Sequence, residues 1–530
     1  MRFSKLSWLL VLCVIIGAAM LRLPKLKQRP MHTDEAVHAI KFGTLLEEGV
    51  YRYDKNEYHG PTLNYLTLIP AKLSSADNIT EINEFTLRIV TVFFGLLLVV
   101  LLLLLFDGLG KLAVIIAAIL TTLSPAMIVY SRYYIQEILL VCFTFAVLVS
   151  GYRYTQSKKV CWALLTGFFL GLMQTTKETW IIAFGSMAVS AVLLIFLQAR
   201  QKHSFSDYLK TLNPRHVLAG IAAALIVSFV LYSSFFSNPL GFIDSFTAYS
   251  TYFSRAAGNS IHIHPWYYYL KNLIYFRLGG GPIWSEGIII LLACVGLVSA
   301  VTKKGLKSID VGLVRFIAIY TVIMTVVYSA IPYKTPWCML GFLHGMILLA
   351  GVGGSVIIKL VHNLLAKQIV IVLLIAAGVH LGWQGYLANY KYYADPVNPY
   401  VYAHTGNDIF KIVEKIEDIS KVHPDGRNTY IQVICPGGDY WPLPWYLRNL
   451  TNIGWYSEVD LKAPAAPLII ASPAVEAELI KKLYELPEPG TVNLYVPLFD
   501  SYTELRPQVE LIALVTTDLY NLIQQQSSNN

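Results

Sequence analysis

The sequence predicts an α-helical membrane protein that crosses the bilayer many times and carries a small α/β domain at its C-terminal end. Hydrophobic residues make up 55% of its 530 residues and charged residues only 14%, a balance that no soluble domain of this size needs. Apolar runs long enough to span a bilayer recur as far as about residue 386. After residue 389, helical and strand patterns alternate instead. We therefore expect a transmembrane domain at residues 1–389 and an α/β domain at residues 390–530.

About eleven membrane-spanning helices are expected. The first apolar run, residues 6–20, follows a short basic head and shows no small-residue cleavage site, so it predicts an uncleaved span. The other spans are expected near residues 85–106, 112–130, 135–152, 160–174, 181–197, 217–236, 287–301, 311–331, 338–359 and 369–386.

The basic residues predict the orientation of these spans. Five connecting loops on one side together hold thirteen lysines and arginines, whereas the short loops on the other side hold one each: Arg132, Lys177 and Lys334. The positive-inside rule places the first group in the cytoplasm. We therefore expect a multi-pass protein of the plasma (cytoplasmic) membrane, and the net charge of +8 reflects topology and not nucleic-acid binding. Four basic residues after the first span disagree with this orientation: Arg22, Lys25, Lys27 and Arg29.

This orientation places two long loops, residues 22–84 and 237–286, and the α/β domain on the extracytoplasmic side. The first loop is far longer than a plain connection between spans. Within it, apolar residues at helical spacing predict a helix over residues 33–48. A second helix is expected from the Gly60-Pro61 pair to about Pro70. Both fit helices that lie in the membrane interface.

The first loop holds a group of ionisable residues: Asp34, Glu35, His38, Glu57 and His59. Paired carboxylates beside imidazoles at a membrane surface suit proton abstraction. A structural role also fits, because Thr33 has the character of an N-cap and acidic residues in a first helical turn favour the helix dipole. Both interpretations stay open, and they are compatible with each other.

The second long loop is rich in aromatic residues and contains His262 and His264. An aromatic belt at the membrane interface accounts for most of these residues. Histidines can also bind metals, but these two are spaced i, i+2 and have no acidic residue close by in the sequence. We predict no metal and no other cofactor, with a divalent cation as the alternative.

The three outer cations share one side of the membrane with the carboxylate pair. Each of Arg132, Lys177 and Lys334 alone fits an interfacial anchor. Together they suggest a site for an anionic headgroup, and a lipid phosphate is the expected anion because its chain can lie between the spans.

In the α/β domain, helices are expected at residues 407–422 and 473–484, and strands at residues 429–435, 468–471 and 492–496. The Pro436-Gly-Gly-Asp439 sequence that follows the first strand lacks a phosphate-loop pattern and predicts a turn.

These motifs resemble those of the membrane-integral GT-C glycosyltransferases, in particular the relatives of protein O-mannosyltransferases and of the aminoarabinose transferase that acts on lipid A. They are most similar to a bacterial and archaeal branch described as flippase-activity-associated. The matching pieces are Asp34-Glu35, His59-Gly-Pro61, Arg132 to Glu137, Lys177, His264-Pro-Trp-Tyr-Tyr268, Tyr333-Lys-Thr-Pro-Trp337 and Tyr440-Trp-Pro-Leu-Pro-Trp445.

The resemblance implies a sugar on a polyprenyl monophosphate as the donor, inverting transfer on the extracytoplasmic side, and Asp34 as the base. The acceptor would be a hydroxyl of a lipid, glycan or protein. A protein acceptor is disfavoured, because the chain lacks the luminal β-trefoil module of eukaryotic O-mannosyltransferases.

The residue chemistry agrees with this implication. A carboxylate can take the proton that the acceptor hydroxyl loses as it attacks, and cations can stabilise the departing phosphate. Glu35 is expected to orient the acceptor or Asp34, and Glu137 to hold Arg132. Further supporting residues are expected at four positions: His38, His59, His264 and Tyr333.

A lipid-linked sugar flippase, or a transport protein associated with one, is the alternative function. Transporters usually place ionisable residues at mid-membrane and contain internal repeats. Here the ionisable residues gather at one surface and no repeat is visible in the sequence, which favours a transferase.

Overall fold

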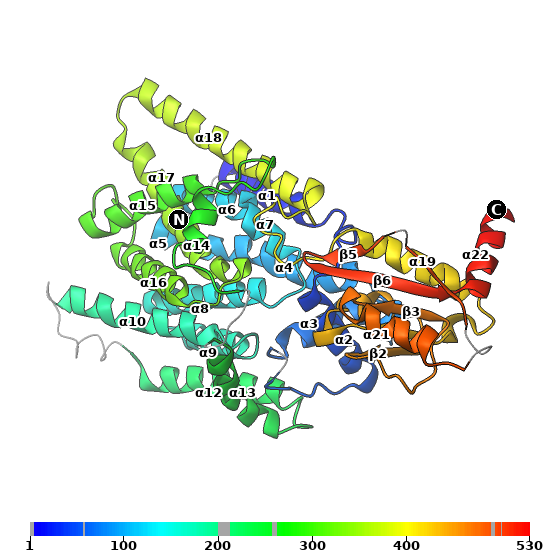
Figure 1. Ribbon diagram of the computed structural model, residues 1–530. Helices are drawn as coiled ribbons and strands as arrows, with labels where there is room; N and C mark the ends of the chain where they lie inside the picture. Colours follow the sequence, from blue (N-terminus) through cyan, green and yellow to red (C-terminus); the bar gives the residue numbers. More distant parts are fainter. Residues whose placement is uncertain are drawn as a thin grey trace. The chain divides into compact units, whose positions relative to one another are not determined.

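The computed structural model describes residues 5–56, 59–199, 212–256, 262–488, 493–499 and 501–529. The chain divides into two compact units (Figure 1). The membrane unit comprises Met1–Leu26, Glu48–Ser75 and Phe85–Tyr402. The sheet unit comprises Lys27–Glu47, Ala76–Glu84 and Ala403–Asn530, so two parts of the predicted first loop belong with the C-terminal region.

The membrane unit is built from helices. In the described part of the chain, seven helices are long and apolar enough to cross a membrane, and three further apolar helices are shorter. The pair α6–α7, bent by 61°, has the length and composition of a broken span or a re-entrant loop. The elements are α1 (Lys5–Arg22), α3 (Thr62–Leu73), α4 (Glu84–Leu101), η2 (Leu102–Leu105), α5 (Phe106–Leu109), α6 (Lys111–Leu123), α7 (Pro125–Ser131), α8 (Glu137–Ser157), α9 (Val160–Gln174), α10 (Trp180–Ala199), α12 (Pro214–Tyr232), α13 (Leu240–Ala256), α14 (Tyr268–Ile274), α15 (Gly287–Thr302), α16 (Val311–Ala330), η3 (Pro336–Met339), α17 (Leu340–Leu360), α18 (Leu364–Tyr386) and η4 (Leu387–Lys391). The fold is that of a polytopic α-helical membrane protein, and the expected number of eleven spans stays a prediction.

Helices α8 and α17 form the centre of the membrane unit. About four fifths of the most apolar window of each is buried, against 6% for the span that contains α18. Glycines allow α15 and α17 to approach closely: a Cβ on Gly353 would lie 2.0 Å from the carbonyl oxygen of Leu292, and one on Gly296 would lie 2.2 Å from that of Leu349. Small residues at such crossings let membrane helices pack backbone to backbone.

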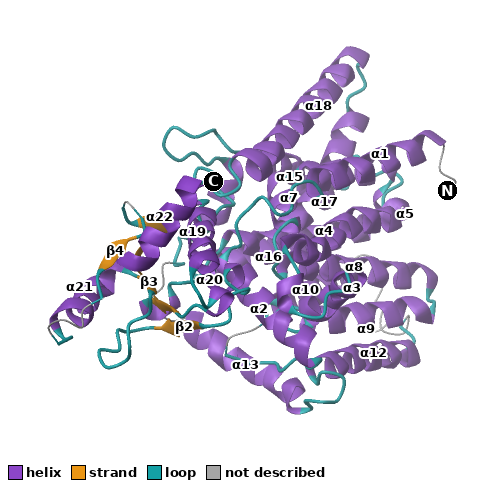
Figure 2. Cartoon of the chain, turned by 90° about the vertical axis from the view of Figure 1, so that its right-hand side faces the viewer, coloured by secondary structure: helices purple, strands orange, loops and turns teal. Residues whose placement is uncertain are grey.

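The sheet unit contains a mixed six-stranded sheet, and the strands of the described chain are confined to this unit (Figure 2). The strand order is β2-β1-β3-β6-β4, with β5 pairing with β6; β1 is parallel to both β2 and β3, and the β6 pairings are antiparallel. The strands are β1 (Ile431–Ile434), β2 (Ile453–Tyr456), β3 (Leu468–Ala471), β4 (Tyr495–Pro497), β5 (Thr503–Arg506) and β6 (Val509–Thr516).

Helices cover both faces of this sheet. On one face, α19 (Asp408–Val422) and α22 (Thr517–Asn529) pack on a core that includes Ile412, Ile416 and Leu519. On the other, α21 (Glu476–Ile480), which continues in the π-helical turn η8 (Lys481–Glu485), packs through Leu479 and Leu483. The unit also contains α2 (Thr33–Glu48), the short α20 (Leu443–Tyr446) and 3₁₀ turns: η1 (Ile79–Glu81), η5 (Gly426–Asn428), η6 (Pro436–Gly438) and η7 (Pro473–Val475).

The side chains of Trp445 in α20 and of Arg448, two residues after this helix, hold the Ala76–Glu84 segment in the sheet unit. The indole N–H of Trp445 donates to Glu84 at 2.8 Å. Arg448 lies 3.9 Å above the ring of Trp445 and donates to the backbone carbonyls of Ile79 and Ile82. Guanidinium groups that bridge carbonyls in this way make strong, directional contacts.

Several predicted elements agree closely with the structure. Helices α2 and α19 and strand β3 occupy the predicted residues to within one position. Helix α3 begins after Pro61 as expected but continues through Pro70 to Leu73, because a proline in the last turn removes only one hydrogen bond. Strands β2, β5 and β6 were not anticipated, Val492 of the last predicted strand lies outside the described residues, and the domain boundary at residue 389 stays a prediction.

Candidate active site

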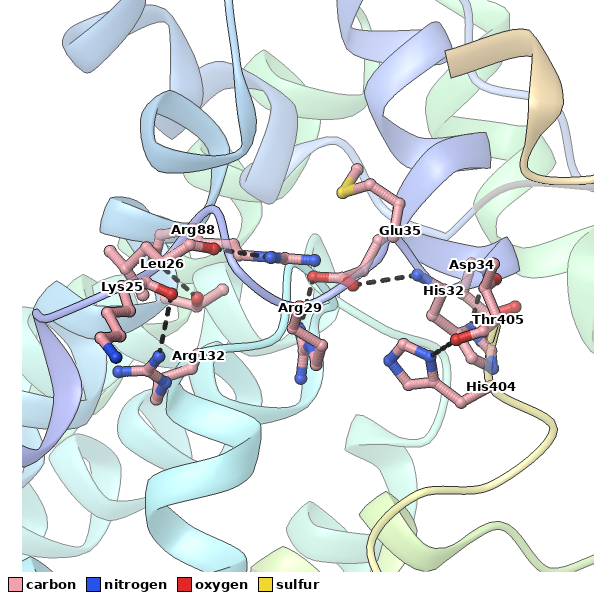
Figure 3. A network of polar contacts seen from close by, with 12 residues as sticks. Lys25, Leu26, Arg29, His32, Asp34, Glu35, Arg88, Arg132, His404 and Thr405 are labelled. Carbon is pink, nitrogen blue, oxygen red and sulfur yellow. Dashed lines mark hydrogen bonds and ion pairs between the residues drawn. The ribbon is translucent and has the colours of Figure 1, made fainter. Parts of the chain in front are cut away.

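The start of α2 is fixed by a reciprocal cap centred on His32. The carbonyl of His32 accepts the N–H of Ala36, and its ring Nδ1 accepts the N–H of Asp34 at 3.0 Å. In return, Glu35 Oε2 accepts the N–H of His32 at 3.1 Å, the arrangement of a capping box (Figure 3). The prediction that Thr33 is the N-cap is therefore wrong by one residue, since an imidazole nitrogen replaces the expected hydroxyl.

The two neighbouring carboxylates have different surroundings. Glu35 is fully buried, and its other oxygen forms an ion pair with Arg29 at 2.9 Å (Figure 3). The side chain of Asp34 is 45% exposed, and Nδ1 of His32 lies 3.9 Å from one of its carboxylate oxygens. The geometry thus gives the capping role to Glu35 and leaves Asp34 as the candidate base.

Two further histidines lie in the sheet unit near this cap. His38 is buried on α2. His404, which the sequence did not single out, is buried with its ring 5.6 Å from that of His32, and its Nδ1 donates to the carbonyl of Thr405. Burial and the charges of Arg29 and His32 hold the pKa of His404 well below its usual value of 6.5. The imidazole of His404 is therefore neutral at physiological pH.

Arg132 is buried and holds the turn that follows α1. Its guanidinium donates to the carbonyl of Lys25 (Figure 3). It also donates to the carbonyls of Arg22 and Pro24 and to the hydroxyl of Tyr390. Arg22 is buried in a similar way, with hydrogen bonds to the carbonyls of residues 121 and 122. Arg22 thus stabilises the packing of the helices. This role explains the position of one of the four basic residues that disagreed with the predicted orientation.

Lys177 and Glu137 form a buried ion pair. Burial alone lowers the pKa of Lys177, but the charge of Glu137 and its hydrogen bond outweigh this effect and hold the pKa above its usual value. The expectation that Glu137 holds Arg132 is wrong, because its partner is the lysine. The next residue, Glu178, accepts hydrogen bonds from the ring of His59 at 2.7 Å and from the hydroxyl of Tyr53 at 3.2 Å.

Lys334 is buried, and no carboxylate in the described ranges forms an ion pair with it. Its ammonium donates to the carbonyls of His264 and Ile331. A β-bridge between Ile263 and Tyr333 joins the two segments that carry these groups. Burial lowers the pKa of Lys334, as expected for an ammonium that is not neutralised by a carboxylate.

The two segments that bind this ammonium group carry aromatic and imidazole rings that contact one another. The hydroxyl of Tyr402 lies 2.8 Å from Nδ1 of His262 and 3.1 Å from Nε2 of His264. The ring of His264 stacks on Tyr268 at 4.2 Å, and that of His262 lies 4.9 Å from Tyr333. The structure therefore brings together three residues that the sequence singled out, Lys334, His264 and Tyr333, and adds Tyr402.

A narrow apolar cleft of about 20 Å³ lies between α8, α10, α16 and η3. The Lys177–Glu137 pair contributes the charged part of its lining, and Trp337 and Cys338 reach it from the segment that follows Lys334. The rest of the lining is mainly aliphatic and aromatic, with Leu140 and Tyr328 among its residues. This volume is close to that of one water molecule, so the cleft is a narrow seam between apolar helices with a charged pair at its edge.

No group of three or more His, Cys, Asp or Glu side chains within the described residues is placed to hold a metal ion. Glu57 lies outside the described residues, so the structure gives no place for it.

Residues 67–239 match the sequence profile of the dolichyl-phosphate-mannose-protein mannosyltransferase family. A comparison with curated protein sequences finds no match. Among solved structures, ArnT from Cupriavidus metallidurans bound to undecaprenyl phosphate is similar over 96% of this chain and 98% of that chain, with 13% identity and a TM-score of 0.63. The oligosaccharyltransferase AglB from Archaeoglobus fulgidus, in complex with an inhibitory peptide and a dolichol-phosphate, is similar over 90% of this chain and 71% of that chain, with 11% identity and a TM-score of 0.56.

At the level of the fold, these similarities confirm the resemblance that the motifs suggested. The profile covers less than half of the chain, and the identities are low, so the site residues and the similarity to the flippase-associated branch stay predictions. The chain has the fold of the GT-C membrane glycosyltransferases, with a C-terminal sheet domain.

Proposed function

We propose that this protein transfers a sugar from a polyprenyl-phosphate donor to an acceptor hydroxyl, with inversion, on the extracytoplasmic face of the plasma membrane. The fold and the match of residues 67–239 support a glycosyltransferase. The observation that carries the proposal is Lys334, a buried ammonium without a carboxylate partner in the described chain, in the segment that leads into the apolar cleft.

The donor is held in two parts. Its polyprenyl chain lies against the apolar helices that border the narrow cleft, where burial of isoprenoid surface supplies affinity. Its phosphate is bound by Lys334, whose charge no carboxylate in the described chain neutralises, and the rings of His264 and Tyr402 line the same region. Lys177 contributes less charge than expected, because Glu137 neutralises it.

The chemical step is a single displacement. The acceptor oxygen attacks the anomeric carbon, its proton passes to the carboxylate of Asp34, and the bond to the phosphate oxygen breaks. The negative charge that develops on the departing polyprenyl phosphate is stabilised by Lys334. The acceptor is a hydroxyl on a lipid, a glycan or a protein, and the sugar is a hexose or a pentose.

Transfer by purified protein tests the proposal. Full-length protein in detergent is incubated with radiolabelled polyprenyl-phosphate sugars and membrane extract, and transfer of label to the extract is expected. Binding of undecaprenyl phosphate is measured in parallel. Lys334→Met should weaken it about ten- to a hundredfold, the scale of a lost charge-assisted hydrogen bond, whereas the exposed Lys303→Ala should bind normally. Donor binding without transfer would support the flippase alternative, and unchanged binding by Lys334→Met would contradict the phosphate site.

The proposed side of the membrane has its own test. Asn452 is exposed in the sheet unit. A cysteine at this position should react with an impermeant thiol reagent in intact cells or spheroplasts. Protection until the membrane is broken would reverse the orientation.

A further inference from the structure

Glu286 is a buried carboxylate that joins three separate segments of the membrane unit. It lies just before α15 and accepts hydrogen bonds from the hydroxyl of Ser124 and the N–H of Ala126, at the bend between α6 and α7. It also accepts the hydroxyl of Tyr400 at 2.6 Å. Glu286 is 1% exposed, and no cation within the described residues pairs with it.

A buried carboxylate without a cation destabilises a fold unless its hydrogen bonds compensate. Burial raises the pKa of Glu286, and its three hydrogen bonds oppose that rise only in part. An amide or an apolar side chain could fill the same space at lower cost. Residues that destabilise the fold in this way occur most often at functional sites.

Tyr400, which donates to Glu286, belongs to a segment in which Asn398, Tyr400 and Tyr402 all form hydrogen bonds with other parts of the unit. Asn398 donates to the carbonyls of residues 388 and 392 and accepts the N–H of Tyr400. The carbonyl of Tyr400 accepts the hydroxyl of Tyr130. Two residues further on, the hydroxyl of Tyr402 lies between the rings of His262 and His264. The N–H of Val401 donates to the carbonyl of Asn398, which closes a turn that fixes Tyr400 directly before the segment that carries Tyr402.

Tyr402 controls the arrangement of the two imidazoles. Its single hydroxyl proton can be donated to only one of the two ring nitrogens, so the other ring must donate its own N–H to the hydroxyl oxygen. The tautomers of His262 and His264 are therefore complementary as long as Tyr402 stays between them. The carbonyl of His264 in turn accepts the ammonium of Lys334.

We propose that Glu286, acting through Tyr400, is a positioning residue that holds Tyr402 between His262 and His264 and so shapes the anion site at Lys334. The role in donor binding rests on the proposed function, whereas the positioning of the two histidines does not. The carboxylate is suited to this role because it accepts three hydrogen bonds at once, which an amide cannot do.

The test compares Glu286→Gln with Tyr400→Phe, which removes only the hydroxyl and guards against misfolding of the first variant. Two quantities are measured on full-length protein in detergent. One is the affinity for undecaprenyl phosphate. The other is the rate at which diethyl pyrocarbonate modifies His262 and His264, followed by mass spectrometry, with the exposed His362 as the internal control.

Both variants should bind undecaprenyl phosphate about three- to tenfold more weakly, the scale of one lost hydrogen bond. His262 and His264 should react severalfold faster than in the wild type, with His362 unchanged. In a Tyr402→Phe background, Glu286→Gln should have no additional effect, because both changes act through one contact. Histidine rates equal to the wild type in both variants, or effects that multiply in the double variant, would overturn the inference. Equal donor binding by wild type and Lys334→Met would refute the proposed phosphate site alone, and the histidine rates would still decide the positioning role.

Discussion

The carboxylate of Glu35 lies 2.9 Å from the guanidinium of Arg29, and both groups are buried. The adjacent carboxylate of Asp34 is 45% exposed. Two acidic residues that look equivalent in the sequence therefore have separate roles: Glu35 secures the start of α2, and Asp34 keeps an accessible carboxylate.

Glu35→Gln should destabilise the sheet unit. The substitution preserves the size of the side chain but removes the charge that faces Arg29, and breaking one side of a buried ion pair typically costs about 3–5 kcal/mol. Denaturant unfolding measures the loss. The double variant Arg29→Met/Glu35→Leu should recover much of the stability, because no buried charge is left. Normal stability with lost turnover in Glu35→Gln would instead make Glu35 part of the chemistry.

Lys177→Met should likewise act on stability more than on donor affinity. It leaves Glu137 buried without its partner, so the melting temperature should fall, and Lys177→Met/Glu137→Leu should restore it. Donor binding should weaken less than in Lys334→Met, because the charge of Lys177 is already neutralised. A stable Lys177→Met protein that no longer binds undecaprenyl phosphate would show that this lysine contacts the phosphate directly.

The stability of the sheet unit should fall in mild acid because of His404. Its folded pKa is well below 6.5, so below pH 6.5 the unfolded chain binds a proton that the folded chain does not. Stability therefore rises with pH in this window and is lost as the pH falls, by up to about 1.4 kcal/mol per pH unit for one group. His404→Gln should flatten the dependence between pH 6.5 and 5, whereas His362→Gln should not. Equal slopes for wild type and His404→Gln would contradict a neutral, buried imidazole.

The sequence predicts those parts of the fold that local patterns determine. Helices α2 and α19 have strong apolar periodicity, and β3 is a short apolar run between turn residues. Strand β2 has no such signal, because Gly454 and Trp455 interrupt any alternation and its pairing with β1 supplies the order. The grouping of residues 76–84 with the C-terminal unit involves contacts of Trp445 and Arg448, which lie more than 360 positions away. For residues 27–47, the N–H of Met31 donates to the hydroxyl of Tyr446, which is also more than 360 positions away in the sequence.

The candidate site was predictable as a set of residues but not as a set of contacts. The sequence identifies the Asp34-Glu35 pair and the three outer cations. It does not reveal that Glu137 pairs with Lys177, because the two are 40 residues apart and Arg132 is nearer in the chain. Tyr402 and Glu286 carry no motif at all, and only the convergence of distant segments exposes them.

The central claim is that Asp34 takes the proton of the acceptor, and single-turnover transfer by Asp34→Asn tests it most directly. The amide keeps the size of the side chain but is a poor base, so transfer should slow by about 10²–10⁴-fold. The free energy of unfolding should change by at most about 1 kcal/mol, the scale of a helix-terminal charge, and undecaprenyl phosphate should still bind. Glu48→Gln, at the exposed end of the same helix, is the matched control and should transfer normally. Transfer by Asp34→Asn at the wild-type rate would contradict the account.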